Sequence, residues 1–216
     1  MNVTEPWPGI RRPSDCGCDR EVLYSWWQCV VCDQYRLAEH VKPGMTLVDV
    51  GACFGHVSIR AAALGAKVIA VEPNAVLVEF IREETRGLLV LVVNVAASDV
   101  DGEAMLLGPP EFASMCRLSP EGTEPVRTVR LDSLYGDQCI DVVKVDVEGH
   151  EAQVLRGAAG IMQTQHPLVL VASYHRDNDP RELAALIRSI EPAYEVREWR
   201  VEQEGCERHL EARVSG

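Results

Sequence analysis

The stretch Thr46–Gly55 constrains the fold more than any other part of this chain. Its first five residues are mostly apolar and suit a buried strand, and the next five hold Gly51 and Gly55 at the start of a helical pattern. Glycine lets the backbone turn sharply and approach a ligand with no Cβ in the way. A second predicted strand, 66–71, is followed by Glu72, which lies 21 positions after Gly51. This layout is typical of a nucleoside site on a doubly wound sheet, where a carboxylate binds the ribose hydroxyls.

The glycine spacing distinguishes between two kinds of nucleoside cofactor. A dinucleotide site usually carries G-x-G-x-x-G, because its pyrophosphate sits against a helix N-terminus. This chain has only G-x-x-x-G, with Ala52 and Cys53 inside it. S-adenosylmethionine carries no phosphate and needs less of that cradle, so the spacing favours it over a nicotinamide dinucleotide. Glycines that serve only the turn itself are the alternative.

Length and composition fit one α/β domain of ordinary globular character. The chain has 216 residues, a formal net charge of −12 and 47% hydrophobic residues. We expect an irregular, cysteine-containing segment over 1–19 and a single domain over 20–216. No apolar run approaches the roughly 20 residues that cross a membrane, and the first residues do not resemble a signal peptide, so a cytoplasmic protein is expected. The acidic balance disfavours a surface for nucleic acid.

The rest of the chain alternates between predicted strands and helices, as in a parallel sheet with crossover helices. A run over 88–95 is almost entirely apolar and predicts a third buried parallel strand. The irregular region 102–131 predicts a β-excursion at the rim of the sheet, where substrate selectivity commonly lies. The other expected elements are helices over 20–41, 56–64, 75–86, 181–190 and from 151 to 157 or 162, strands over 140–149 and 168–173, and a hairpin over 194–214.

Four cysteines near the start of the chain leave three interpretations open. Cys16 and Cys18 lie in the irregular segment, whereas Cys29 and Cys32 lie three positions apart on a predicted helix. Four thiolates could bind a structural zinc ion, or the four residues could form two disulfides. Free thiols are the third interpretation, because one pair lies on a regular helix rather than in a zinc-binding turn.

Polar side chains also occur where predicted strands end. Asp146 and Glu148 lie two positions apart, and alternation along the strand over 140–149 would place them on the same side. Carboxylates at strand ends face the crevice where open α/β sheets bind ligands, although one of them could serve only to cap the next helix. Asn94, at the end of the third strand, would lie near the adenine of a bound cofactor, unless the polar residues here only form the turn around Asp99 and Asp101 that ends the strand. His175 follows the fifth strand in the same way and is a candidate base.

Three passages together resemble the FkbM family of S-adenosylmethionine-dependent methyltransferases. They are VDVGACFGHVSIRAAALGAKVIAVEPN (48–74), LDSL with VVKVDVEGHEAQVLRGA (131–158) and SYHRDNDPRELAALI (173–187). The resemblance implies a class I methyltransferase fold, Rossmann-like and doubly wound, with a mostly parallel seven-stranded α/β sheet and an antiparallel last strand. It also implies methylation of an oxygen, typically a hydroxyl of a sugar, a glycan or a natural product. Cys53 stands where the family often has asparagine, and the N-terminal cysteines lie outside the resemblance.

The residue pattern and the resemblance together define a predicted site. Methyl transfer from a sulfonium needs an aligned nucleophile, and an alcohol is helped by a base or a metal ion near it. We assign catalysis to Asp146, Glu148 and His175, with His175 as base; His150 is a further candidate, and a magnesium ion on the carboxylates is left open. The predicted cofactor-binding residues are Asp49, Gly51, Ala52, Phe54, Gly55, Glu72, Pro73, Asn94, Ala96 and Asp146.

Other functions stay open on the sequence alone. They are methylation of RNA or protein, a nicotinamide-dependent oxidoreductase on the same type of sheet, and a non-catalytic module that retains the cofactor fold. The missing third glycine argues against the oxidoreductase, and the acidic balance argues against RNA. The intact strand-end carboxylates argue against a module that has lost its chemistry. We expect a small-molecule or glycan acceptor and no membrane partner, and make no prediction of the oligomeric state.

Overall fold

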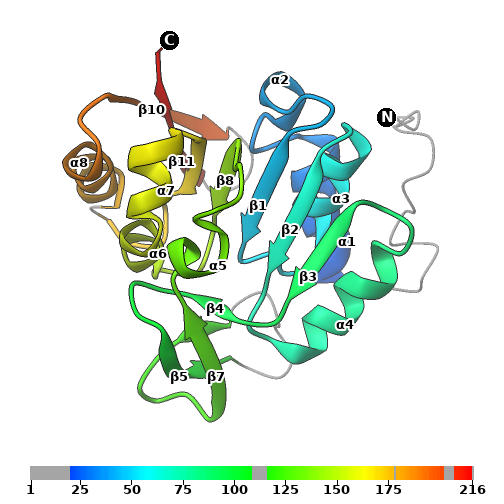
Figure 1. Ribbon diagram of the computed structural model, residues 1–216. Helices are drawn as coiled ribbons and strands as arrows, with labels where there is room; N and C mark the ends of the chain where they lie inside the picture. The colour runs from blue at the N-terminus through cyan, green and yellow to red at the C-terminus, as the bar shows by residue number, and fades with distance from the viewer. Residues whose placement is uncertain (1–19, 109–115, 178, 202–206, 216) are drawn as a thin grey trace.

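Seven strands form the main sheet of the computed structural model, which describes residues 20–108, 116–177, 179–201 and 207–215 (Figure 1). Along the sheet the strand order is β10-β11-β9-β8-β1-β2-β3. Strands β9, β8, β1, β2 and β3 are mutually parallel, and β11 pairs antiparallel with both β9 and β10. The predicted mostly parallel sheet with an antiparallel last strand is therefore confirmed. The bounds are β1 (Thr46–Val50), β2 (Lys67–Val71), β3 (Val90–Val93), β8 (Val142–Val145), β9 (Leu168–Ala172), β10 (Tyr194–Val201) and β11 (Glu207–Val214).

Helices cover both faces of this sheet because successive side chains of each strand point to opposite faces. On one face, Val48 and Val143 pack in a core cluster with residues of the helices α5 to α8. On the other face, Leu47 and Val142 pack with residues of η2 (Trp27–Val31), α2 (Leu37–His40) and α3, and Ala70 packs with Ile81 of α4. The bounds are α3 (His56–Ala63), α4 (Ala75–Glu84), α5 (Leu131–Tyr135), α6 (Glu151–Gly157), α7 (Ala159–Gln165) and α8 (Asp179–Ile190).

The predicted start of α4 and end of α3 follow from local backbone chemistry. The side chain of Asn74 accepts hydrogen bonds from the N–H groups of Val76 and Leu77, which caps α4. Gly65 adopts φ +91°, a conformation that glycine reaches without strain, and the chain leaves α3 there. Both predicted boundaries are confirmed. The predicted helix after Gly149 is divided into α6 and α7 at Ala158.

The continuous helix predicted over 20–41 is wrong. The chain forms α1 (Arg20–Trp26), continues as a π-helical turn, η2 (Trp27–Val31), and begins a new short helix, α2 (Leu37–His40). Asp33 lies between the last two in a left-handed conformation, and its carboxylate accepts the N–H groups of Leu37 and Ala38 at 2.8 and 2.9 Å. An aspartate that binds the backbone ahead of it competes with helix continuation. We call Arg20–His40 the N-terminal helical segment.

The third strand is an edge strand, so the prediction that it is buried is also wrong. β3 pairs with β2 and ends the strand order, and Leu91 within it is 59% exposed. Leu88 and Leu89, which belonged to the same apolar run, precede the strand and are exposed as well. A continuous apolar run predicts strand well, but it does not report how many neighbours the strand has.

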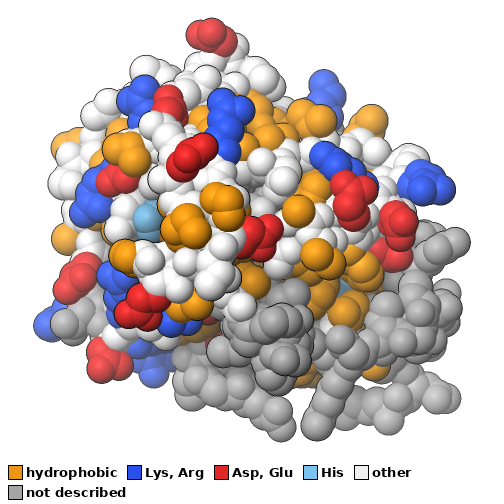
Figure 2. Space-filling model, turned by 90° about the horizontal axis from the view of Figure 1, so that it is seen from below, with side chains coloured by type: hydrophobic (Ala, Val, Ile, Leu, Met, Phe, Trp, Pro, Cys, Tyr) orange, Lys and Arg blue, Asp and Glu red, His pale blue; other side chains and the backbone are white. Residues whose placement is uncertain are grey.

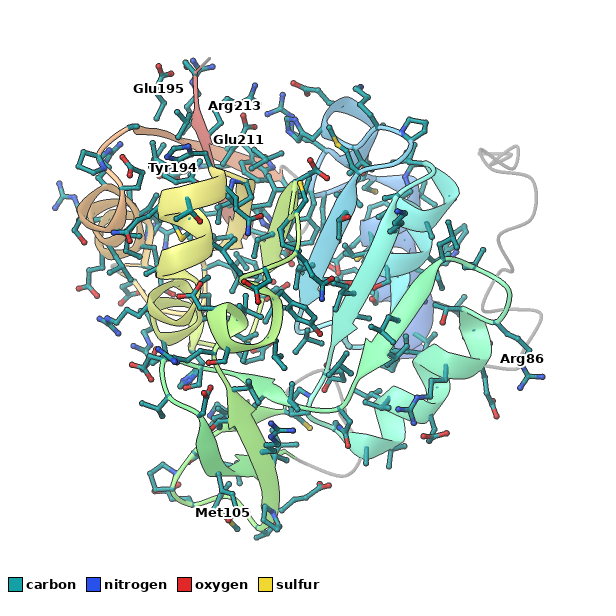
Figure 3. The ribbon with its side chains drawn as sticks, viewed as in Figure 1. Arg86, Met105, Tyr194, Glu195, Glu211 and Arg213 are labelled. Carbon is teal, nitrogen blue, oxygen red and sulfur yellow. The ribbon has the colours of Figure 1, made fainter. Side chains whose placement is uncertain are left out.

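A second, four-stranded sheet lies below the carboxyl ends of the main strands in Figure 1. Its order is β4 (Ala96–Ala97), β7 (Glu124–Val129), β5 (Gly102–Leu107) and β6 (Arg117–Leu118). The predicted excursion at the rim is therefore confirmed. Met105 marks this small sheet in Figure 3, at the opposite end of the molecule from Glu195 and Glu211 on the β10–β11 hairpin. Among the described residues, no helix combines the length and the apolar character that crossing a membrane requires.

Candidate active site

A cavity of about 320 Å³ lies at the carboxyl ends of β1, β2 and β8, where the sequence predicted a ligand. Its wall comes from three parts of the chain. The strand ends and their turns contribute Gly51, Glu72 and Asp146, the small sheet contributes Arg117, and the N-terminal helical segment contributes Gln28. Figure 2 views the molecule from this end and shows acidic and basic side chains interspersed there, so the net negative charge is not concentrated on this face.

The turn after β1 is built so that the backbone approaches its neighbours closely. Gly51 adopts φ +74°, and a Cβ at this position would lie 1.8 Å from the carbonyl oxygen of Asp146. The N–H groups of Gly51 and Ala52 both point at the carbonyl oxygen of Val71, at 3.0 and 3.2 Å. The ends of β1, β2 and β8 are thereby held together, and Gly55, at φ +75°, starts α3 directly behind them.

Glu72 is buried, yet both of its carboxylate oxygens already accept backbone hydrogen bonds. Oε2 accepts the N–H of Cys53 and Oε1 accepts the N–H of Asn74, each at 2.9 Å. Burial raises the pKa of Glu72 to about 7 against the opposing effect of these two donors. Each oxygen retains a free lone-pair position. The two oxygens can therefore accept a pair of adjacent hydroxyls, as the predicted ribose contact requires.

Replacing Glu72 with alanine is expected to weaken S-adenosylmethionine binding about 10- to 100-fold, because two hydrogen bonds to a buried carboxylate are lost. Affinity in the unchanged protein should rise as the pH increases through about 7, because the ionised form is the better acceptor and burial raises the pKa to that value. Calorimetric titration between pH 6 and 8 measures both effects. Glu83→Ala, an exposed change on α4, serves as the control. An affinity for Glu72→Ala equal to that of the unchanged protein would refute the ribose role.

Lys144, which lines the cavity, neutralises the carboxylate of Asp49, which has no access to water. Its Nζ lies 3.0 Å from Asp49 Oδ1 and donates to the carbonyl oxygen of Gly51 at 2.8 Å. Asp49 also accepts a hydrogen bond from the Ser58 hydroxyl at 2.6 Å. Burial alone would lower the pKa of Lys144, but the charges of Asp49 and Asp146 outweigh it and raise the pKa above its ordinary value. Lys144 therefore stays charged and ties the glycine turn to the sheet.

Asp146, Glu148 and His175 converge at the end of the cavity next to β8 and β9. His175 Nε2 lies 3.5 Å from Asp146 Oδ1 and 3.5 Å from Glu148 Oε2, while Nδ1 lies 2.9 Å from Glu151 Oε1. Burial would lower the pKa of His175, but the contacts with Glu148, Glu151 and Asp146 raise it to about 11. With no metal ion bound, the imidazole is thus protonated at neutral pH and has no lone pair with which to act as a base.

Two tyrosine hydroxyls donate hydrogen bonds to the second carboxylate oxygen of Asp146, Oδ2. Tyr35 donates its hydroxyl to Asp146 Oδ2 at 2.6 Å, and the Tyr174 hydroxyl donates to the same oxygen at 3.4 Å. Burial would raise the pKa of Asp146, but Lys144 and His175 lower it below its ordinary value, helped by the Tyr35 hydrogen bond. Asp146 is therefore ionised, with Oδ2 fixed by the tyrosines and Oδ1 turned toward His175.

The structure brings most of the predicted residues into the cavity wall, but not all of them. Asn94 does not line the cavity; its side-chain amide donates to the carbonyls of Glu72 and Pro73 and so braces that turn. Phe54 packs under α4 with Leu77, and His175 lies behind the two carboxylates. Eight of the predicted residues line the cavity: Gly51, Ala52, Glu72, Pro73, Ala96, Asp146, Glu148 and His150. The other predicted residues do not line it: Asp49, Phe54, Gly55, Asn94 and His175.

Several residues of the site were missed by the sequence analysis. Lys144 had a visible signal, since it is the one charged residue in the otherwise apolar strand β8. Tyr35 had none, because it reaches Asp146 across 111 positions of sequence. A second hydrogen bond joins the N-terminal helical segment to the site: the Gln28 side-chain amide donates to Glu207 at 2.9 Å.

The four N-terminal cysteines are only partly within the described residues. Cys29 lies buried in η2, lines the cavity and is a free thiol, and Cys32 follows that helix. Cys16 and Cys18 lie outside the described residues, so the zinc and disulfide interpretations of the full set stay untested. Burial raises the pKa of the Cys29 thiol to about 12, which makes it unreactive at neutral pH.

Known proteins resemble this chain in sequence and in fold. Residues 49–204 match the family model of the methyltransferase FkbM domain. The hexuronic acid methyltransferase AglP of Haloferax volcanii is 28% identical over 167 residues, which cover 74% of this chain and 68% of that protein. A methyltransferase FkbM structure from Methylobacillus flagellatus superposes with a TM-score of 0.61 at 19% identity, covering 90% of this chain and 55% of that one. This chain thus spans little more than half of that larger protein.

The likeness to solved structures identifies the fold. A SAM-dependent methyltransferase from Aquifex aeolicus superposes with a TM-score of 0.51 at 16% identity, over 86% of this chain and 88% of that one. The fold is that of class I methyltransferases, in which dependence on S-adenosylmethionine is typical. Since the matched residues 49–204 make up most of its length, the chain belongs to the FkbM family of methyltransferases.

Proposed function

We propose that this methyltransferase transfers the methyl group of S-adenosylmethionine to a hydroxyl of a sugar or glycan. One observation carries the proposal: the cavity that contains the glycine turn and Glu72 also contains the carboxylates of Asp146 and Glu148. A cofactor whose ribose is held by Glu72 and whose methionine end passes Gly51 would direct its methyl group into the remaining space. Asp146 and Glu148 border that space and would face the acceptor.

The reaction needs little from the protein beyond alignment and removal of one proton. The acceptor oxygen attacks the methyl carbon in line with the C–S bond, the C–O bond forms as the C–S bond breaks, and neutral S-adenosylhomocysteine leaves. The hydroxyl proton must depart as the oxygen becomes bonded to the methyl group. Asp146 and Glu148 bring negative charge to this point and take up that proton, whereas His175 keeps the two carboxylates in place.

An acidic sugar is the acceptor class that we favour. AglP, the relative from Haloferax volcanii, is named for its action on a hexuronic acid. In this chain Arg117 of β6 lines the same cavity as Asp146 and Glu148, so the small sheet brings a positive charge to the cavity wall. A guanidinium pairs with a planar carboxylate through two parallel hydrogen bonds. Arg117 would hold the uronate carboxylate while a ring hydroxyl faces Asp146 and Glu148.

The proposal is tested with methyl-labelled S-adenosylmethionine and a panel of acceptors: oligosaccharides ending in hexuronic acids, the matching neutral oligosaccharides, RNA and protein. We expect label in the sugars, with the uronate preferred, and a product that resists mild base, as an ether does and a methyl ester does not. Arg117→Leu should raise KM for the uronate and leave the neutral sugar unaffected. Label in RNA or protein but not in any sugar would overturn the proposal.

His175→Ala is expected to lower turnover about 100-fold while the affinity for S-adenosylmethionine stays the same. His175 does not line the cavity, and without its positive charge Asp146 and Glu148 repel each other and lose their shared orientation. Steady-state kinetics and calorimetric titration measure the two quantities. His166→Ala, a change at an exposed histidine outside the site, should alter neither. Loss of cofactor binding in His175→Ala would contradict the assignment.

A further inference from the structure

The three side chains Asp146, Glu148 and His175 are arranged as ligands of a metal ion. Asp146 Oδ1 and Glu148 Oε2 each lie 3.5 Å from His175 Nε2, and all three atoms lie within 4.8 Å of one another. A point equidistant from these atoms is about 2.4 Å or less from each, which is close to the metal–ligand distances of divalent cations. The donors therefore surround a cation-sized position without any rearrangement of the backbone.

His175 is the observation that separates this cluster from an ordinary group of acids. Only 9% of its side chain is exposed, and neither ring nitrogen has an aligned hydrogen bond to any described residue. On the other side of the ring, Nδ1 meets Glu151 Oε1 at 2.9 Å, and that oxygen is itself held by the N–H groups of Val147 and Gly149. A carboxylate behind the far nitrogen of a histidine fixes the ring and its tautomer in metal sites.

The backbone and side-chain contacts of Asp146 and Glu148 also suit metal binding. One side of the cluster is open to the cavity. The Tyr35 hydroxyl occupies Asp146 Oδ2 and leaves Oδ1 for a cation. Glu148 adopts φ +56°, a left-handed conformation that is unfavourable for a residue with a Cβ and that is common at functional sites. Asp146 and Glu148 line the cavity, whereas His175 lies behind them. The remaining coordination positions would therefore face the cavity, as in a catalytic rather than a structural metal site.

We propose that Asp146, Glu148 and His175 bind a divalent first-row transition-metal ion, such as Mn²⁺ or Zn²⁺, at the wall of the cavity. One imidazole nitrogen with two carboxylate oxygens suits these ions better than Ca²⁺ or Mg²⁺, which prefer oxygen donors alone. Binding of the ion does not depend on the identity of the acceptor. Only its role in catalysis rests on the proposed function.

In that role the ion would hold the acceptor hydroxyl through its oxygen. Coordination lowers the pKa of a bound hydroxyl, so its proton leaves to solvent before or during transfer. The oxygen then attacks the methyl carbon, the C–S bond breaks, and the products are the methyl ether, S-adenosylhomocysteine and one proton. The carboxylates would act through the ion instead of taking the proton themselves.

The test measures Mn²⁺ binding to the full chain, freed of metal with a chelator, by electron paramagnetic resonance and calorimetry in the absence of any acceptor. We expect one ion per chain in the unchanged protein, an affinity at least about tenfold lower in Glu148→Gln and in His175→Gln, and displacement of Mn²⁺ by Zn²⁺ but not by equal Mg²⁺. Glu207→Gln is the matched control, because Glu207 lines the same cavity but bonds Gln28 and lies outside the triad. It should bind Mn²⁺ normally.

Two results would overturn the site. One is no Mn²⁺ binding by the unchanged protein up to about 1 mM, and the other is unaltered binding in both triad variants. Glu148 is the decisive position, because its side chain is 36% exposed and its replacement by glutamine leaves the fold intact. A failure of methyl transfer to sugars would overturn the proposed function but would leave the binding result as it stands, so the two proposals fail separately.

Discussion

A Gly51→Ala variant is expected to lose S-adenosylmethionine binding together with about 3 kcal/mol of unfolding free energy. Gly51 adopts φ +74°, where any residue with a Cβ is strained, and the added carbon would lie 1.8 Å from the backbone oxygen of Asp146. A backbone atom cannot rotate away as a flexible side chain does. The ends of β1 and β8 would have to separate, and these two ends form the floor of the cavity.

Gly44→Ala is the control that isolates the steric contact from the backbone strain. Gly44 adopts φ +87°, but a Cβ there would meet no atom within 4 Å. This variant should lose about 1 kcal/mol and bind the cofactor normally. Denaturant unfolding and calorimetric titration measure both variants. If Gly51→Ala bound the cofactor as tightly as the unchanged protein does, the turn would not be the cofactor site.

Replacing Lys144 with methionine should destabilise the protein by about 3–5 kcal/mol, because it leaves the Asp49 carboxylate without its partner. Lys144 and Asp49 have side chains that are 4% and 0% exposed, so water cannot take over the contact. The same substitution removes the donor to the carbonyl of Gly51, so the cofactor affinity should fall as well. Denaturant unfolding and cofactor titration measure these two losses.

Lys67→Met provides the matched comparison, since Lys67 begins the adjacent strand β2 and is exposed; a change within about 0.5 kcal/mol is expected. In the double variant Asp49→Asn with Lys144→Met, the uncompensated charge is absent and part of the stability should return. A loss below about 1 kcal/mol in Lys144→Met would show that Asp49 does not depend on the lysine.

The elements that sequence patterns predicted well are those set by local chemistry. Asn74 caps α4 through its own side chain, and the glycine-bearing turn after β1 needs the positive φ that Gly51 and Gly55 supply. The sequence also predicted that Asp146 and Glu148 lie beside one cavity, but the structural reason differs from the one expected. They are not alternate residues of a strand: β8 ends at Val145, and the left-handed turn at Glu148 returns its carboxylate toward Asp146.

What the sequence could not predict depends on contacts between distant segments. Burial of β3 depends on whether another strand pairs with its outer edge, and none of the described strands does. Tyr35 and Glu207 reach the site from segments on either side of the matched region 49–204, and no short-range pattern marks them. Lys144 is intermediate, because a lysine within an apolar central strand predicts a buried partner but does not identify Asp49.

The position of β11 between β9 and β10 has a consequence for the newly made protein. β10 is synthesised first, yet it contacts the rest of the sheet only through β11, so until that strand appears both of its edges are unpaired. Glu207, which closes one side of the cavity, arrives with the same strand. The nascent chain therefore has to shield an unfinished sheet edge, and the cavity wall lacks Glu207 until β11 has left the ribosome.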